Sequence, residues 1–283
     1  MKSSVISDAR KRLHRQLAKD TLMVDSKGVP TNSDGSNVLS VKLAKAILVD
    51  VPSGKCRKRP NGQTLGLRME KAVLAFVKKV FPSLQHLRPG KWIVEGGQTI
   101  SQFQQYGNLT VLENVLKSSK ELRVSVGTDY IIKPDVIIAR KLETDSFINT
   151  PNELVDDECA ILADIRKSGK ESPLALLHAS ISCKWTMRSD RAQNSRSEEL
   201  NLIRYRKGRL PHVVVVTAEP LPSRLASLCL GTGDLDCVYH IALPELREAI
   251  IRTKVEGVLE LLDDMINGKR LKDISDLPLD LAV

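Results

Sequence analysis

Aromatic residues are scarce in this sequence, at 4% of its 283 residues. Proteins that bind RNA or single-stranded DNA stack bases on Phe, Tyr and Trp, so this scarcity argues against either partner. Long apolar runs are also missing, since none approaches the roughly 18–20 residues needed to span a bilayer. Residues 1–20 lack the apolar core of a signal peptide. We therefore expect a soluble, cytoplasmic protein with no membrane partner.

Cysteine is the second scarce residue type. The chain has 5 cysteines, an odd number, and no two of them form a Cys-x-x-Cys pair. Neither a disulfide framework nor a zinc site is indicated by this pattern. We expect these cysteines to be buried thiols of a cytosolic protein.

Charge, by contrast, is abundant and unbalanced. The chain has 43 Lys and Arg against 34 Asp and Glu, which gives a formal net charge of +9. A basic balance favours a polyanionic partner. Because few rings are available for stacking, duplex DNA contacted through its phosphates and groove edges is the favoured one. The length suits a single domain over residues 1–283 with a substantial core.

Apolar periodicity predicts an α/β fold with a mixed central β-sheet flanked by helices. Helices are expected where apolar residues recur at helical spacing, and a polar helix where Ser189 can cap the start and Gly208 the end. Strands are expected where β-branched apolar residues run together. The predicted helices are 1–25, 41–51, 67–81, 189–208 and 243–269 (the last as one or two helices), and the predicted strands are 130–140, 173–185 and 211–219.

Two of the predicted strands carry residues suited to phosphodiester hydrolysis. Pro134-Asp135 lies in one strand, and Ser182-Cys183-Lys184 ends another. A carboxylate can bind a hard cation that neutralises phosphate charge, and a neighbouring lysine can orient water and stabilise the transition state. Taken alone, each residue also has a common structural role, as a turn residue or a solvated strand end. The usual nuclease signature has an acid two residues before the lysine, where this chain has Ser182.

A further acid must therefore complete such a site, because serine is no substitute for a carboxylate as a strong magnesium ligand. Glu198 and Glu199, on the predicted helix after Lys184, are both candidates, and helix geometry alone does not separate them. Glu70 is another candidate acid. It is equally suited to stabilise the N-terminus of the predicted 67–81 helix.

Arginine and aspartate cluster just after the candidate lysine, as Arg188-Ser189-Asp190-Arg191. Arginine is poorly placed at a helix N-terminus, which favours acids, so the pair suggests another role. Arginine pairs bidentately with guanine, and aspartate accepts from the cytosine amino group. The cluster can read two G·C pairs, and a twofold dimer would double these to a palindrome. The alternative is a surface cluster of Arg–Asp ion pairs.

Long blocks around these residues resemble the NgoMIV-type type II (IIF) restriction endonucleases of the PD-(D/E)XK nuclease superfamily. Shorter stretches of likeness, such as SDGSN, GQT, LQHLRPG and GTDYIIKPD, extend it over nearly the whole chain. The principal blocks are LLHASISCKWTMRSDRAQNSRSE (176–198), RKGRLPHVVVVTAEP (206–220), LGTGDLDCVYH (230–240) and NGKRLKDISDLPLDLAV (267–283).

The resemblance implies a restriction-endonuclease-like core and a magnesium-dependent active site. In this family the second metal-binding acid has moved from the strand to the following helix. Asp135, Ser182, Lys184 and Glu198 match the active site, with Asp135 and Glu198 as the metal ligands, and Glu70 matches an additional acid. The match to the family's spacing selects Glu198 over its neighbour.

The resemblance also implies which residues read DNA bases. Arg188, Asp190 and Arg191 match residues that read an inner CCGG, while Asp34 and Arg224 match those that read an outer G·C pair. Such enzymes are homotetramers, assembled from homodimers, that bind two copies of G^CCGGC and leave four-base 5′ overhangs as host defence in restriction-modification systems. The chain departs from the family chiefly in residues 52–61, 96–125 and 141–172.

Two other interpretations fit parts of the sequence. A repair or junction nuclease of the same core would read DNA structure, and would not need five base-reading residues. A non-catalytic sequence-specific DNA-binding protein would not depend on Asp135 or Lys184.

Overall fold

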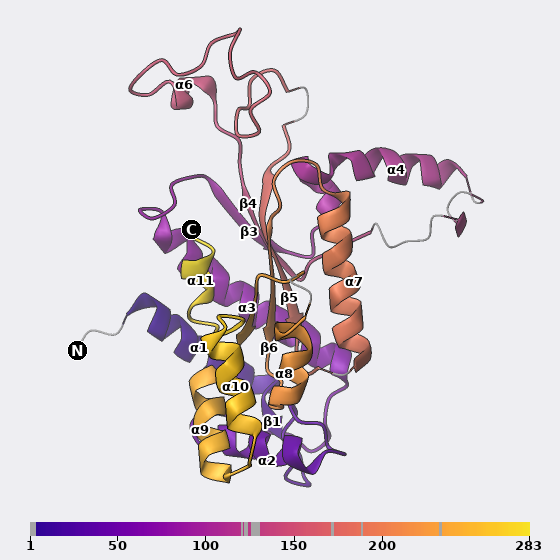
Figure 1. Cartoon of the computed structure of the whole chain (residues 1–283), viewed down its shortest axis with the longest axis vertical. Helices are drawn as coiled ribbons and strands as arrows, with labels where there is room; N and C mark the ends of the chain where they lie inside the picture. Colours follow the sequence, from indigo (N-terminus) through magenta and orange to yellow (C-terminus); the bar gives the residue numbers. More distant parts are fainter. Residues whose placement is uncertain are drawn as a thin grey trace.

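The computed structural model describes residues 4–119, 121, 124–125, 131–170, 173–187, 189–231 and 234–283, apart from the side chains of 189–196. Within these residues a six-stranded sheet forms the centre of the molecule (Figure 1). The strands are β3 (Trp92–Gly96), β4 (Val136–Arg140), β5 (Leu176–Lys184), β6 (His212–Thr217), β7 (Cys237–His240) and β8 (Leu271–Asp273), and a separate parallel pair is formed by β1 (Met23–Val24) and β2 (Gly54–Lys55).

The six strands lie in chain order across the sheet, from β3 to β8. Strand β4 pairs antiparallel with both β3 and β5. From β5 to β8 every pairing is parallel. The predicted mixed sheet is therefore confirmed.

Helices cover the sheet on both sides, with α1 and α11 on one side and α7 on the other (Figure 1). Helix α1 packs on α3, α2 packs on α9, and α10 packs on α8 and α9. The α-helices are α1 (Val5–Asp20), α2 (Val38–Ile47), α3 (Gly62–Val80), α4 (Gly107–Ser118), α6 (Asp145–Ile148), α7 (Ser189–Tyr205), α8 (Pro222–Cys229), α9 (Leu243–Thr253), α10 (Val258–Asn267) and α11 (Leu277–Asp280).

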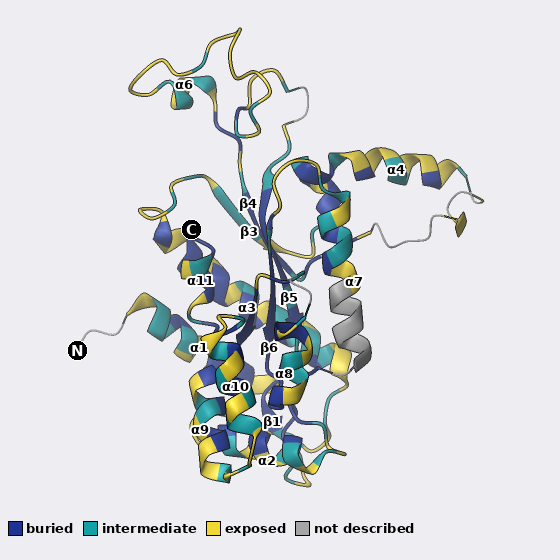
Figure 2. Ribbon diagram, viewed as in Figure 1, coloured by how far each residue is buried: buried dark blue, intermediate teal, exposed yellow. Residues whose placement is uncertain are grey.

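Helix α3 shows how the sequence builds this scaffold. The Asn61 side chain accepts a hydrogen bond from the Thr64 backbone N–H and so caps the first turn. Met69, Phe76 and Val80 belong to an apolar face that is buried against the sheet, and α3 contacts β3, β4 and β5. Each such side chain stabilises the fold by about 1.5–3 kcal/mol relative to an exposed one. The buried interior runs through the strands in Figure 2.

A helix lies in each predicted helical region, and the 243–269 region forms two, α9 and α10. The predicted 1–25 helix is wrong at its end, because α1 stops at Asp20 and Met23–Val24 form strand β1. The second helix begins three residues before the predicted 41–51, because Asn37 caps it by accepting from the Ser40 N–H. The predicted 130–140 strand pairs only from Val136 onward, while 131–135 are irregular and residue 130 lies outside the described part. Pro134 has no N–H for a ladder bond, which opposes an earlier start.

The expectation of buried thiols is correct for three of the five cysteines and wrong for two. Cys183, Cys229 and Cys237 are buried, whereas Cys56 is half-buried and Cys159 is exposed. All five are free thiols. Cys159 follows the Asp156 turn, where its N–H bonds the Asp156 carboxylate on the surface. In the described part of the chain, no helix combines the length and apolar character that crossing a membrane requires.

Candidate active site and recognition residues

The antiparallel pairing of β4 with β5 brings two of the candidate catalytic residues together. Val136, the first residue of β4, pairs with Ile181 near the end of β5. Asp135 therefore lies beside the last residues of β5, and its Oδ2 accepts a hydrogen bond of 2.6 Å from the Cys183 backbone N–H. Lys184 ends the same strand. The pairing of β4 with β5 therefore sets the positions of both the carboxylate and the lysine.

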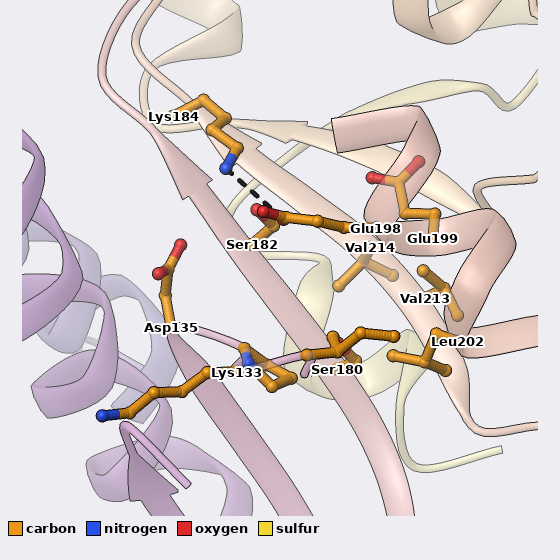
Figure 3. Close-up of a pocket in the computed structure, with 12 residues that line it drawn as sticks. Lys133, Asp135, Ser180, Ser182, Lys184, Glu198, Glu199, Leu202, Val213 and Val214 are labelled. Atoms are coloured by element: carbon orange, nitrogen blue, oxygen red, sulfur yellow. Dashed lines mark ion pairs between the residues drawn. The ribbon is translucent and has the colours of Figure 1, made fainter. Parts of the chain in front are cut away.

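Helix α7 supplies an acid to the same place. The Glu198 Oε2 lies 3.9 Å from the Lys184 Nζ. Asp135, Ser182, Lys184 and Glu198 line one small cavity of about 70 Å³. Figure 3 shows the Glu198 side chain extending toward Lys184 across Ser182, with Asp135 facing them.

The two candidate glutamates differ in their surroundings. The Glu198 side chain is 57% exposed and reaches the lysine. Glu199 is 4% exposed, and Figure 3 shows it farther from Lys184 than Glu198, which alone is joined to the lysine by an ion pair there. Both glutamates line the cavity, and the geometry favours Glu198 as the acid that pairs with Lys184.

Glu70 approaches the site from α3. It lines an adjoining surface pocket together with Lys184 and Glu198. Burial and the charge of Asp135 raise the pKa of Glu70, while Lys184 opposes the rise. Burial also raises the pKa of Asp135, against the Cys183 N–H and Lys184. Partly desolvated carboxylates thus lie close to Lys184, and a further cation between them would stabilise their ionised forms.

These residues fit a magnesium ion, although no group of three or more His, Cys, Asp or Glu able to hold a metal occurs among the described residues. Magnesium keeps several of its waters and is usually held by one or two carboxylates plus substrate phosphates. Asp135 and Glu198, which line one cavity, match that requirement. Ser182 lies between them and adds a neutral hydroxyl.

A second cluster joins the two residues expected to read the outer base pair. Asp34 lies in the turn before α2, and Arg224 lies in α8, 190 residues later. The Arg224 Nη2 donates a hydrogen bond of 2.6 Å to the Asp34 Oδ2. The arginine, together with two hydrogen bonds from Ser36, holds the pKa of Asp34 well below its usual range. Asp34 therefore stays ionised well below neutral pH.

The expected inner readers are only partly described. Arg188 lies outside the described residues, and so do the side chains of Asp190 and Arg191. The backbone places Asp190 and Arg191 in the first turn of α7, which begins at Ser189. Met187, just before this segment, is buried.

The sequence analysis missed Glu219, a wholly buried acid next to Arg224. The Glu219 Oε2 lies 3.8 Å from the Arg224 Nη1. Its only sequence signal is a glutamate between the apolar run VVVVTA and Pro220, where an acid has no packing role.

Comparison with known proteins shows which family the chain resembles. The NgoMIV restriction enzyme family matches residues 13–283. The Type II restriction enzyme NgoMIV of Neisseria gonorrhoeae is 48% identical over 285 residues, covering 99% of this chain and 99% of that protein. Among solved structures, a complex of the restriction endonuclease PspGI with substrate DNA covers 98% of this chain and 90% of that chain, at 15% identity and a TM-score of 0.37. That overlap is too loose to carry an argument about the site.

Proposed function

Since this chain belongs to the NgoMIV restriction enzyme family and is a type II restriction endonuclease, we propose that it cleaves duplex DNA at the palindrome GCCGGC. The proposed cut is G^CCGGC, which leaves 5′ overhangs, and its role is host defence in the cytoplasm. One observation carries the chemistry: Asp135, Lys184 and Glu198 meet at the end of β5, with Glu70 beside them.

In the proposed reaction, each residue at this strand end has a separate task. Asp135 and Glu198 would hold Mg²⁺, which when bound neutralises phosphate charge and activates water. Lys184 places a positive charge beside the scissile phosphate, where it stabilises the charge that develops in the transition state. Ser182 can donate its hydroxyl proton to a phosphate oxygen or to water. Glu70 can orient water from the α3 side.

The Asp34–Arg224 pair supports reading of the outer base pair. Arginine recognises guanine through O6 and N7, and aspartate accepts from the cytosine N4. A side-by-side arginine and aspartate therefore complement the two edges of one G·C pair. The 2.6 Å contact means that both side chains already lie close enough to face the same base pair.

The inner CCGG is assigned to the segment that opens α7. Arg188, Asp190 and Arg191 would read two G·C pairs in each half-site, and a twofold dimer would complete the palindrome. We further propose that dimers pair into a homotetramer that binds two DNA sites.

Digestion of a sequenced plasmid with Mg²⁺, followed by mapping of the cut ends, tests the proposal. Cuts confined to G^CCGGC would support it. Cuts without sequence preference would indicate a nuclease that reads DNA structure, and sequence-specific binding without cleavage would indicate a non-catalytic protein. Omitting Mg²⁺ should abolish cleavage, and cleavage that persists in EDTA would refute the metal requirement.

A further inference from the structure

Glu219 is a buried acid outside the catalytic cavity. It lies between β6 and α8, and its side chain is 0% exposed. Burying an ionised carboxylate is costly unless it is paired and hydrogen-bonded. An acid at this position therefore needs hydrogen-bond donors and a cation close to its carboxylate.

The two carboxylate oxygens of Glu219 hold two different segments. The Oε2 accepts a hydrogen bond of 2.7 Å from the Met187 backbone N–H. The Oε1 accepts one of 3.1 Å from the Leu221 N–H, immediately before α8. The Oε2 also lies 3.8 Å from the Arg224 Nη1. One side chain thus fixes the residue that precedes Arg188 and the helix that carries Arg224.

The segment that carries Asp34 joins the same network. The Asn32 Nδ2 donates to the Ala218 carbonyl at 3.2 Å, and the Trp185 Nε1 donates to the Thr31 carbonyl at 3.0 Å. Three stretches far apart in the sequence, 31–34, 185–187 and 218–224, are therefore tied together around Glu219.

We propose that Glu219 is a positioning residue that couples the reading of the inner CCGG to the reading of the outer G·C pair. This inference rests on the proposed function. Arg224 lies between two carboxylates, Asp34 at the surface and Glu219 in the interior. When the Asp34 carboxylate accepts a hydrogen bond from a cytosine in place of Arg224, Glu219 still neutralises the charge of the Arg224 guanidinium and holds its orientation. Because the same carboxylate anchors Met187, a displacement of Arg224 is transmitted to the segment that reads the inner pairs.

Glu219→Gln tests this coupling, because it preserves the size of the side chain and removes its charge. The assay compares kcat/KM on duplexes that contain GCCGGC, a changed outer pair or a changed inner pair. We expect Glu219→Gln to lower discrimination at both positions, by on the order of tenfold each. Asp273→Asn is the matched control, since Asp273 is also a buried carboxylate that accepts a backbone N–H and pairs with an arginine, Arg10. It should leave discrimination unchanged.

Unchanged discrimination at either pair in a folded Glu219→Gln protein would overturn the coupling. If that variant does not fold, Arg224→Ala replaces it, since the Arg224 side chain is partly exposed. The coupling predicts that Arg224→Ala lowers discrimination at the inner pairs as well as at the outer pair. A loss of discrimination confined to the outer pair would refute it. Cleavage of GCCGGC by the unmodified protein tests the proposed function separately.

Discussion

The burial of Glu219 makes the stability of this protein depend on pH in a way that one substitution isolates. Burial raises the pKa of Glu219 from 4.5 to about 7, although two backbone N–H groups and Arg224 oppose the rise. The folded protein therefore binds this proton more tightly than the unfolded chain does. Its stabilising contribution is complete below pH 4.5 and is lost as the pH rises through about 7.

The size of the effect follows from that interval. At about 1.36 kcal/mol per pH unit, the interval from 4.5 to about 7 corresponds to about 3 kcal/mol. Glu219→Gln has no such proton. Relative to that variant, the unmodified protein should lose about 2.5 kcal/mol of this free energy of unfolding as the pH rises from about 5 to 8.

The difference in free energy of unfolding between the two proteins is measured by urea unfolding at several pH values, with the fluorescence of the buried Trp185 as the signal. The other charged groups around Glu219 do not titrate in this window. Arginine side chains do not lose their proton in proteins, the pKa of Asp34 lies far below this window, and burial lowers the pKa of His240 to about 4. The pKa of Asp273 is also lowered, so Asp273→Asn should give a flat difference above pH 5. Parallel stability curves for the unmodified protein and Glu219→Gln would refute the reasoning.

Further predictions concern the catalytic and recognition residues. Asp135→Ala and Lys184→Ala should each slow cleavage by at least about a hundredfold while gel-shift binding to GCCGGC persists, and parallel loss of binding would instead indicate a structural role. Glu198→Gln should impair Mg²⁺-dependent cleavage while Glu199→Gln retains it, and the reverse result in single-turnover assays would exchange their roles. Arg191→Ala should cost about 1–3 kcal/mol in binding and relax reading at one base pair, whereas uniform weakening on all sequences would mark a phosphate contact.

Strands and helices with strong apolar periodicity could be predicted from the sequence, and α7 from its capping residues, whereas short strands could not. The spacing of apolar residues predicts the buried strands β5 and β6 and the amphipathic helix α3. Strands β7 and β8 are four and three residues long, too short for any period to emerge. Strand β3 contains Trp92 and Glu95 on a partly exposed edge, so its burial pattern is weak.

The candidate site divides in a similar way. Lys184 and Asp135 stand out because each is a charged residue on an apolar predicted strand. The family resemblance selected Glu198 over Glu199 and supplied Asp34 and Arg224. Their contacts required the fold, since the register of β4 against β5 is what places Asp135 beside Cys183.

Glu219 had no comparable signal. Its role depends on partners 32 residues before it and on a helix after it, and no local spacing encodes that meeting.

Helix α7 connects the segment proposed to read bases with the proposed metal-binding acid. It begins at Ser189, in the segment assigned to base reading, and carries Glu198 nine residues later on the same rod. At about 1.5 Å per residue, Ser189 and Glu198 are roughly 14 Å apart along the helix axis. If the first turn of α7 reads the inner CCGG as proposed, a wrong sequence that displaces this turn would also displace Glu198 relative to Asp135, because the turn and Glu198 lie on one continuous helix. A mismatched site would then be bound while Glu198 is out of place for metal binding. Cleavage of the wrong sequence would be suppressed without any other conformational change.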